Sequence, residues 1–257
     1  INPNSPLDSA QGYYVQIAAS GFDDVAGNSF AGINDATTLN FTAADVAGPT
    51  LSSSTPADNA TGVAVDANIV LTFNENVVAG SGNITLKKSS DNSTVETMAV
   101  DGANVSISGA AVTVNPTANL DSSQGYYLQI AATAFDDASG NSYAGINDTT
   151  TLNFTAADVV GPTMVITSTT SGVSSGAATN DSTINLTFTA NEAATGFAVG
   201  DITVTGGSLS SFATVSSTVY TATFTPSGAG ATTIDVAANK FTDAAGNNNS
   251  AATQFTW

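Results

Sequence analysis

The sequence has 257 residues and a net charge of −18 at pH 7, with 42% hydrophobic and only 9% charged residues. A chain of this length can bury the cores of two or three domains. Its three basic residues are too few to neutralise phosphates, which argues against binding nucleic acids or anionic membranes and favours cations as partners. The absence of Cys and His excludes disulfides, thiolate zinc sites and the commonest catalytic base, so we expect no enzymatic activity.

A long internal repeat organises the chain. Residues 3–50 return as residues 116–163 without a gap, at an offset of 113 residues. This period suits a domain of about 100 residues with a junction. Within the repeat, FDDVAGNSFAGIND (22–35) returns as FDDASGNSYAGIND (135–148), and a shorter form, FTDAAGNNNS, occupies residues 241–250.

Short segments rich in β-branched and aromatic residues predict strands throughout the chain. In the middle of the chain they cover residues 68–73, 83–86, 105–108, 111–116, 126–132 and 150–155. In the last hundred residues they cover 183–192, 201–207, 219–226, 232–241 and 253–257. The pattern predicts an all-β fold of tandem immunoglobulin-like antiparallel β-sandwiches. We expect the C-terminal half of a domain at 1–46, a complete domain at 47–159 and a divergent domain at 160–257.

The half domain is expected to expose one apolar face. Its residues Tyr13, Val15, Ile17, Leu39 and Phe41 would be core residues in a complete sandwich. Either the chain is cut from a longer one, or a neighbouring chain completes the half domain by strand addition. The sequence leaves both explanations open.

Sandwich topology brings acidic segments together at one end of each domain. At the complete domain we expect Asp45 of the arriving linker, Glu75 of the B–C loop and Asp137 of the F–G loop to meet, with Asn141 and Asp148 beside them. The next junction is expected to repeat this set with Asp158, Glu192, Asp243 and Asn247. The half domain carries the loop positions Asp24, Asn28 and Asp35.

Calcium is the predicted cofactor of these acidic segments, and all twelve of these residues are its predicted ligands. Calcium takes about six to eight oxygen ligands and tolerates irregular geometry, whereas unneutralised carboxylates in one place would repel one another. The alternative is that Asp-x-x-Gly-Asn forms an Asx-type turn with no metal at all.

Particular motifs resemble a known group of domains. Residues 50–155, with STPADNATGVAVDANIVLTFNENV, LDSSQGYY and DDASGN, resemble the bacterial Ig-like domains of S-layer proteins and large repetitive surface proteins. Residues 162–257, with NDSTINLTFTANE, GDITVTGG and FTDAAGNNNSAATQFTW, are similar to the Ig-like repeats of bacterial adhesins. The resemblance implies calcium at domain junctions in many relatives.

These observations together predict a structural segment of a long bacterial surface or extracellular protein, such as a stalk, S-layer or filament. Its expected partners are neighbouring repeats of the same chain and other copies in a lattice or filament. No stretch reaches 18 apolar residues, so we expect no membrane insertion. The alternative is an adhesin module that binds a glycan or a receptor.

Overall fold

The computed structural model describes residues 2–257, and it is all-β as predicted. The chain divides into two compact units, of which the first ends at Ala157 and the second covers Asp158–Trp257. This division lies close to the predicted boundary after residue 159, and the predicted boundary after residue 46 stays a prediction. Ile1 of the predicted half domain lies outside the described residues.

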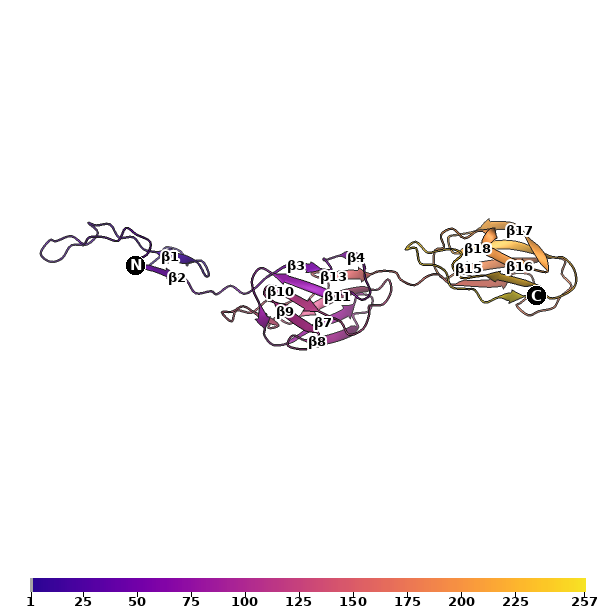
Figure 1. The fold of residues 1–257 in the computed structure, drawn as a ribbon, viewed down its shortest axis with the longest axis horizontal. Helices are drawn as coiled ribbons and strands as arrows, with labels where there is room; N and C mark the ends of the chain where they lie inside the picture. The colour runs from indigo at the N-terminus through magenta and orange to yellow at the C-terminus, as the bar shows by residue number, and fades with distance from the viewer. Residues whose placement is uncertain (1) are drawn as a thin grey trace. The chain divides into compact units, whose positions relative to one another are not determined.

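A complete sandwich occupies the later part of the first unit (Figure 1). One sheet has the order β3 (Leu51–Thr55), β5 (Ile69–Phe73), β10 (Ala111–Val114), β9 (Val105–Ser108). The other has the order β4 (Ala60–Val63), β13 (Asn153–Ala156), β11 (Gly125–Ile130), β7 (Asn83–Lys88), β8 (Thr94–Ala99). A small two-stranded sheet joins β6 (Val78–Ala79) and β12 (Phe135–Asp136). The neighbours pair antiparallel except β4 and β13, which pair parallel at one edge.

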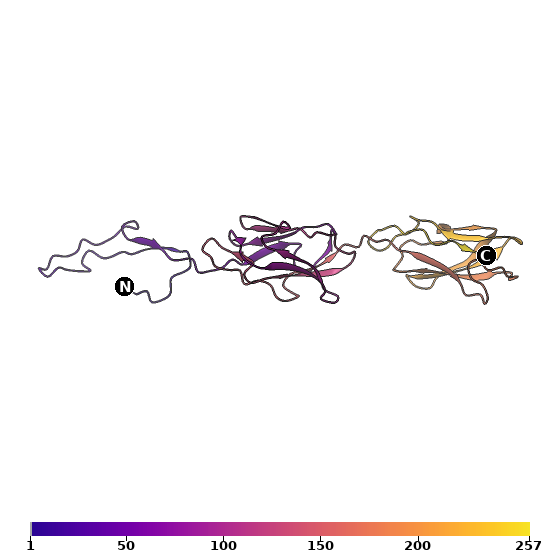
Figure 2. The same ribbon diagram turned by 90° about the horizontal axis from the view of Figure 1, so that it is seen from below.

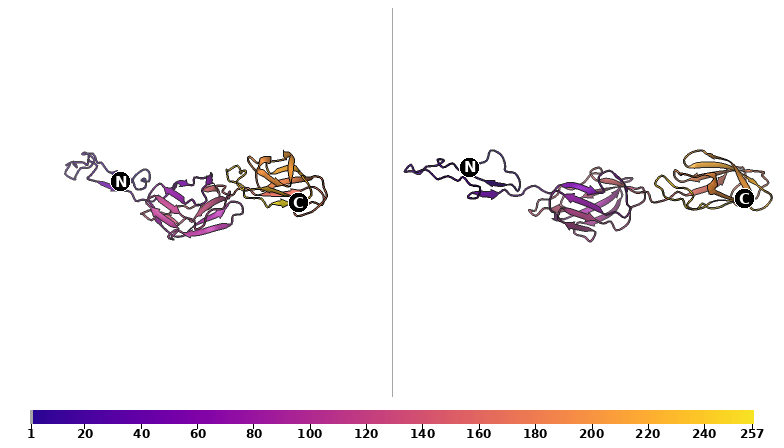
Figure 3. Two further views of the ribbon diagram at one scale, coloured as in Figure 1. Left: turned by 45° about the vertical axis from the view of Figure 1, so that its right-hand side comes forward. Right: turned by 45° about the horizontal axis from the view of Figure 1, so that its top comes forward.

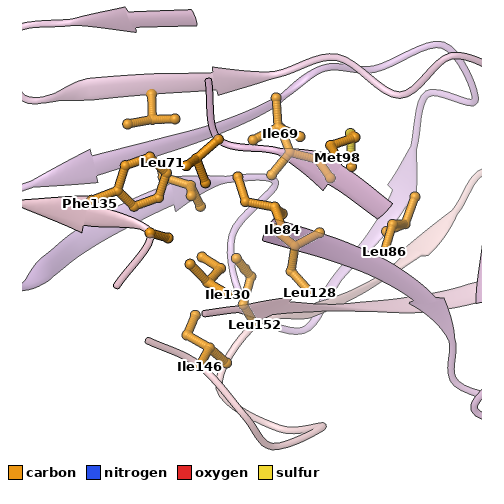
Figure 4. Packing of buried hydrophobic residues seen from close by; sticks show 14 of the residues in the cluster. Ile69, Leu71, Ile84, Leu86, Met98, Leu128, Ile130, Phe135, Ile146 and Leu152 are labelled. Carbon is orange, nitrogen blue, oxygen red and sulfur yellow. The ribbon is translucent and has the colours of Figure 1, made fainter. Parts of the chain in front are cut away.

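The alternation of buried and more exposed side chains along the strands explains the core of this sandwich. In β5, Ile69, Leu71 and Phe73 are buried while the residues between them are half-buried, as a period of two requires. Strands of both sheets turn their apolar side chains toward one another, among them Ile84, Leu128 and the other residues of Figure 4. The core therefore contains residues from both halves of the repeat, from Ile69 near its start to Ala156 near its end.

The second unit is another sandwich, whose strands are seen from further sides in Figures 2 and 3. One sheet has the order β14 (Met164–Ser168), β15 (Ile184–Ala190), β18 (Val219–Pro226), β17 (Gly207–Thr214). The other has the order β16 (Ile202–Thr205), β19 (Thr233–Val236), β20 (Phe255–Thr256). A single turn of 3₁₀ helix, η1 (Val199–Asp201), precedes β16. Phe188, Phe224 and Phe255 are fully buried between the sheets.

The segment before the first sandwich forms one hairpin-like pair, β1 (Gly12–Tyr14) with β2 (Asn40–Thr42). Leu39 and Phe41 are exposed, as predicted, whereas Tyr13, Val15 and Ile17 are half-buried. Part of this local cover comes from Tyr13 stacking on Phe41, with ring centroids 5.9 Å apart. The predicted apolar face is therefore present and incompletely covered.

A tyrosine corner closes the first sandwich at the start of β11. Tyr126 is buried, and its hydroxyl accepts a hydrogen bond of 2.8 Å from the backbone N–H of Asp121. The neighbouring Tyr127 is buried as well, so the structure shields both tyrosines of the Gly-Tyr-Tyr sequence from solvent.

Candidate metal centre

The F–G loop of the first sandwich is organised around the carboxylate of Asp137. One oxygen accepts the backbone N–H groups of Ser139 and Asn141, each at 2.8 Å, and the other accepts the Asn141 side-chain amide at 2.7 Å. Gly140 has a φ of +86°, a conformation that glycine adopts without strain. The amide of Asn141 and the backbone donors lower the pKa of Asp137 despite its burial. This buried side chain is therefore a stable carboxylate.

The linker that enters the first sandwich runs along this loop. The side-chain amide of Asn141 donates to the backbone carbonyl of Asp45 at 3.3 Å. Further on, the backbone N–H of Thr50 donates to Oδ1 of Asn74 at 2.6 Å, and the N–H of Asn74 donates back to the carbonyl of Thr50 at 3.0 Å. These bonds hold the linker between the B–C and F–G loops.

Three carboxylates meet where these segments converge. Oxygens of Asp45, Glu75 and Asp137 all lie within 4.8 Å of one another. Burial raises the pKa of Glu75, and the charges of Asp137 and Asp45 raise it further. Like charges held this close destabilise one another. The first cluster, Asp45–Glu75–Asp137, is therefore a concentration of negative charge that a cation would relieve.

The second unit builds the same arrangement from a divergent sequence. Oxygens of Asp158, Glu192 and Asp243 also lie within 4.8 Å of one another. Asn247 donates its amide to Asp243 at 2.8 Å and to the carbonyl of Asp158 at 3.2 Å. Burial acts most strongly on the pKa of Asp243 and raises it, but hydrogen bonds from Asn247 and the loop backbone leave that pKa lowered. Burial, then Asp158 and Asp243, raise the pKa of Glu192. We call this set the second cluster.

Two family models, each described as a bacterial Ig-like domain, match residues 45–156 and residues 158–256. The chain carries two tandem bacterial Ig-like domains. No curated protein matches the chain. Bacterial Ig-like domains are typically non-enzymatic and are common in surface and extracellular proteins, which indicates a structural or adhesive module of that kind. Within residues 2–257, the structure contains no helix with the length and apolar character that a membrane crossing requires.

Asp148 was expected in the first cluster, and the structure does not bring it there. Its carboxylate accepts the backbone N–H and the hydroxyl of both Thr150 and Thr151, at 2.7–3.1 Å. These hydrogen bonds lower its pKa to about 2. Asp35 makes the same turn with Thr37 and Thr38. Asp148 therefore stabilises the turn before β13, and Asp35 stabilises the turn before β2.

The loop at residues 22–35, before the first sandwich, repeats the local geometry of Asp137. Asp24 accepts the backbone N–H and the side-chain amide of Asn28, each at 2.8 Å. Within residues 2–257, however, Asp24 belongs to no group of three carboxylates like those of the Ig-like domains. The loop forms its turn by these local hydrogen bonds.

Two asparagines that position the linkers were not predicted from the sequence. Asn74 and Asn191 immediately precede Glu75 and Glu192, and the Oδ1 of each accepts the N–H of a linker threonine at 2.6 Å. In both Ig-like domains the dipeptide Asn-Glu follows directly after a strand, β5 or β15, and it pairs one linker-binding side chain with one acid. The role of Asn141 and Asn247 also differs from expectation, since their amides donate to a linker carbonyl and to an aspartate.

Gly161 permits the linker of the second Ig-like domain to approach its F–G loop. A β-carbon added there would lie 1.9 Å from the carbonyl oxygen of Asn248. We expect Gly161→Ala to lower the free energy of unfolding of this domain by about 1–3 kcal/mol, because two backbone segments must move apart. Thermal unfolding measures the loss. Gly200→Ala, where nothing lies within 4 Å of the added carbon, is the control. Equal effects of the two variants would contradict the close packing.

Proposed function

We propose that the chain is a structural repeat segment of a long bacterial surface or extracellular protein, and that calcium at its two acidic clusters stiffens the domain junctions. The observation that carries this proposal is the recurrence of one arrangement in two domains of different sequence. In each, a linker aspartate, a B–C loop glutamate and an F–G loop aspartate bring oxygens within 4.8 Å of one another. Recurrence favours a shared ligand over a chance grouping of exposed acids.

The residues present fit calcium. Carboxylate oxygens are hard ligands, and three carboxylates that each bind through one or two oxygens can supply much of a calcium coordination shell. The chain contains no Cys and no His, which disfavours the softer transition metals. The cation would be held by Asp45, Glu75 and Asp137 in the first cluster and by Asp158, Glu192 and Asp243 in the second. Asn141 and Asn247 would orient the aspartates and the linker.

A cation in either cluster would have a mechanical consequence. It would supply the positive charge that removes the repulsion between the acids. It would also connect the linker aspartate to two loops of the domain that follows, so the backbone of the linker would lose rotational freedom. A domain preceding such a linker would then have fewer orientations available. Extension, spacing, and lattice or filament formation all depend on that restriction.

Small-angle X-ray scattering tests this function. The chain is measured with calcium, with a chelator, and as a control with magnesium, which prefers regular octahedral sites and gives up water reluctantly. We expect calcium to narrow the distribution of particle dimensions and the chelator to widen it. The Asp158→Asn/Glu192→Gln variant should keep the wide distribution in calcium. Profiles that are the same with calcium and with chelator would overturn the stiffening role.

A hollow in the second Ig-like domain supports the adhesin alternative. Thr179, Asp181 and Trp257 are among the residues that line a volume of about 660 Å³, and the Trp257 Nε1–H donates to Oγ1 of Thr179 at 3.0 Å. This volume lies within the range of small-ligand sites, and the hollow combines an aromatic ring with polar groups. Saturable binding of a soluble glycan that is lost in Trp257→Ala would favour this function over a purely structural one.

A further inference from the structure

A hollow of about 400 Å³ lies at one end of the first Ig-like domain, and we call it the polar hollow. It is lined by residues 65–67 of the loop between β4 and β5, by Asn104 before β9, and by residues 115–120 of the loop between β10 and β11. Strand β5 begins beside the hollow and ends next to Glu75, so the hollow and the first cluster lie at opposite ends of this strand. A volume of this size accommodates a small ligand.

Backbone hydrogen bonds fix the walls of the polar hollow. The N–H of Leu120 donates to the carbonyl of Val65 at 2.7 Å and joins the two lining loops. The N–H of Asn115 donates to the carbonyl of Asn104 at 2.8 Å and joins the second loop to the start of β9. The hollow therefore has its shape before any ligand binds, which lowers the entropic cost of binding.

The carboxylate of Glu96 on β8 reinforces one wall of the hollow. It accepts the side-chain amide of Asn104 at 3.0 Å, the backbone N–H of Thr117 at 2.8 Å, and also the hydroxyl of Thr117. The amide of Asn104 donates to Oγ1 of Thr117 as well, at 2.9 Å. These polar groups satisfy one another, so they stabilise the wall and leave ligand binding to other side chains.

Three polar side chains of the hollow have no such partners. Within residues 2–257, the carboxylate of Asp66 and the side-chain amides of Asn115 and Asn119 form no hydrogen bond or ion pair with another residue. All three residues are exposed. Unpaired acceptors and donors on fixed walls can exchange their water for the polar groups of a ligand.

The chemistry of these groups limits the class of ligand. The net charge of −18 and the carboxylate of Asp66 repel anions. Asp66 is also the one acid among the lining residues, which is too few carboxylates to hold a metal ion as the two clusters would. A carboxylate accepts strongly from hydroxyl groups, and a carboxamide both donates and accepts. A neutral, hydroxyl-rich sugar uses all of these groups.

The second Ig-like domain has a hollow at the corresponding place, between the loop before β15 and the loop after β18. Each hollow takes one aspartate, Asp66 or Asp181, from the position three residues before the isoleucine that begins the following strand, Ile69 or Ile184. Asp181 already accepts the hydroxyl of Thr179 at 2.5 Å, whereas Asp66 is free to accept a ligand. Recurrence in two divergent sequences favours a common use of this end of the domain.

We propose that the polar hollow of the first Ig-like domain binds one sugar unit of a neutral glycan. Asp66 accepts hydrogen bonds from sugar hydroxyls, and the amides of Asn115 and Asn119 bond further hydroxyls as donors or acceptors. Because these groups are exposed to water, each contributes modestly and a single site binds weakly. The site contains no residue of either acidic cluster, so it goes beyond calcium stiffening.

Nuclear magnetic resonance of the isotope-labelled whole chain tests the proposal, by titration with neutral trisaccharides of glucose, galactose, mannose or N-acetylglucosamine. We expect at least one of them to shift the backbone signals of residues 65–67 and 115–120 and the side-chain amide signals of the two asparagines. The shifts should persist with a chelator, because no metal takes part. Shifts that vanish with the chelator would overturn direct binding by Asp66.

Asp66→Asn should weaken this binding about tenfold, because a hydrogen bond to a charged acceptor becomes one to a neutral acceptor. The residue is exposed and unpaired, so the fold does not depend on its charge. Asp101→Asn is the matched control, since Asp101 is an exposed aspartate of the same domain that does not line the hollow. The control should bind as the unaltered chain does.

The proposal would be wrong if no trisaccharide shifted the signals of the polar hollow at its solubility limit. Shifts confined to the hollow at Trp257 would place the glycan in the second domain and would also overturn it. Equal affinities of the Asp66→Asn variant and the unaltered chain would remove the central contact. None of these results bears on the scattering response to calcium, so the glycan site and the structural function fail separately.

Discussion

Phe135→Ala is expected to lower the free energy of unfolding of the first Ig-like domain by about 3–5 kcal/mol. The ring of Phe135 is fully buried and packs against that of Phe73, with centroids 5.3 Å apart, a distance that favours aromatic pairs. Its removal deletes these contacts and leaves a cavity between sheets that cannot fully collapse. Calorimetry of the whole chain should show the transition of this domain falling by more than about 10 °C while the transition of the second domain stays in place.

The repeat supplies a matched control for this substitution. Phe22 occupies the equivalent position in the same Phe-Asp-Asp motif, but this residue is 62% exposed. Phe22→Ala is therefore expected to change the free energy of unfolding by less than about 0.5 kcal/mol. Losses of similar size from the two substitutions would contradict the exposure of Phe22, because they would require its ring to be packed in a core of its own.

Strands with strong local patterns could be predicted from the sequence, and weakly patterned ones could not. The prediction of 68–73 is met by β5, and that of 219–226 by β18, since both segments are rich in β-branched and aromatic residues and alternate between buried and half-buried positions over most of their length. Strand β17 (Gly207–Thr214) was not predicted, because its glycine and serines have low strand propensity. It forms by pairing with β18, a tertiary contact that no local window contains. The parallel pairing of β4 with β13 was missed for the same reason.

The acidic clusters show a similar division. Topology alone predicted that Asp45, Glu75 and Asp137 would meet, because loops at one end of a sandwich are neighbours whatever their separation in sequence. The same topological argument was wrong for Asp148. This residue lies in the same loop, but its carboxylate accepts hydrogen bonds from two threonines of the following turn. The donor role of Asn141 was also beyond the sequence, since an amide can present either its oxygen or its NH₂ group.

Calcium is expected to raise the thermal stability of both Ig-like domains. A ligand that binds the folded state alone stabilises it by about 2.7 kcal/mol when its free concentration is 100 times its Kd. Differential scanning calorimetry of the metal-free chain against rising calcium should show both transitions moving upward, and calorimetric titration should give two calcium ions per chain. Magnesium at the same concentration should move the transitions less.

Single substitutions then assign each calcium ion to its cluster. Glu75→Gln should remove the calcium response of the first domain and leave that of the second, with Glu192→Gln doing the reverse. In the absence of calcium, Glu75→Gln should leave the stability of the domain unchanged or raise it slightly, because burial and the charges of Asp137 and Asp45 already disfavour the ionised glutamate. Asp148→Asn is the control, since its carboxylate lies outside the cluster and the amide retains an acceptor oxygen for the threonine turn. A calcium response that survives Glu75→Gln, or that Asp148→Asn abolishes, would move the ion away from the three converging acids.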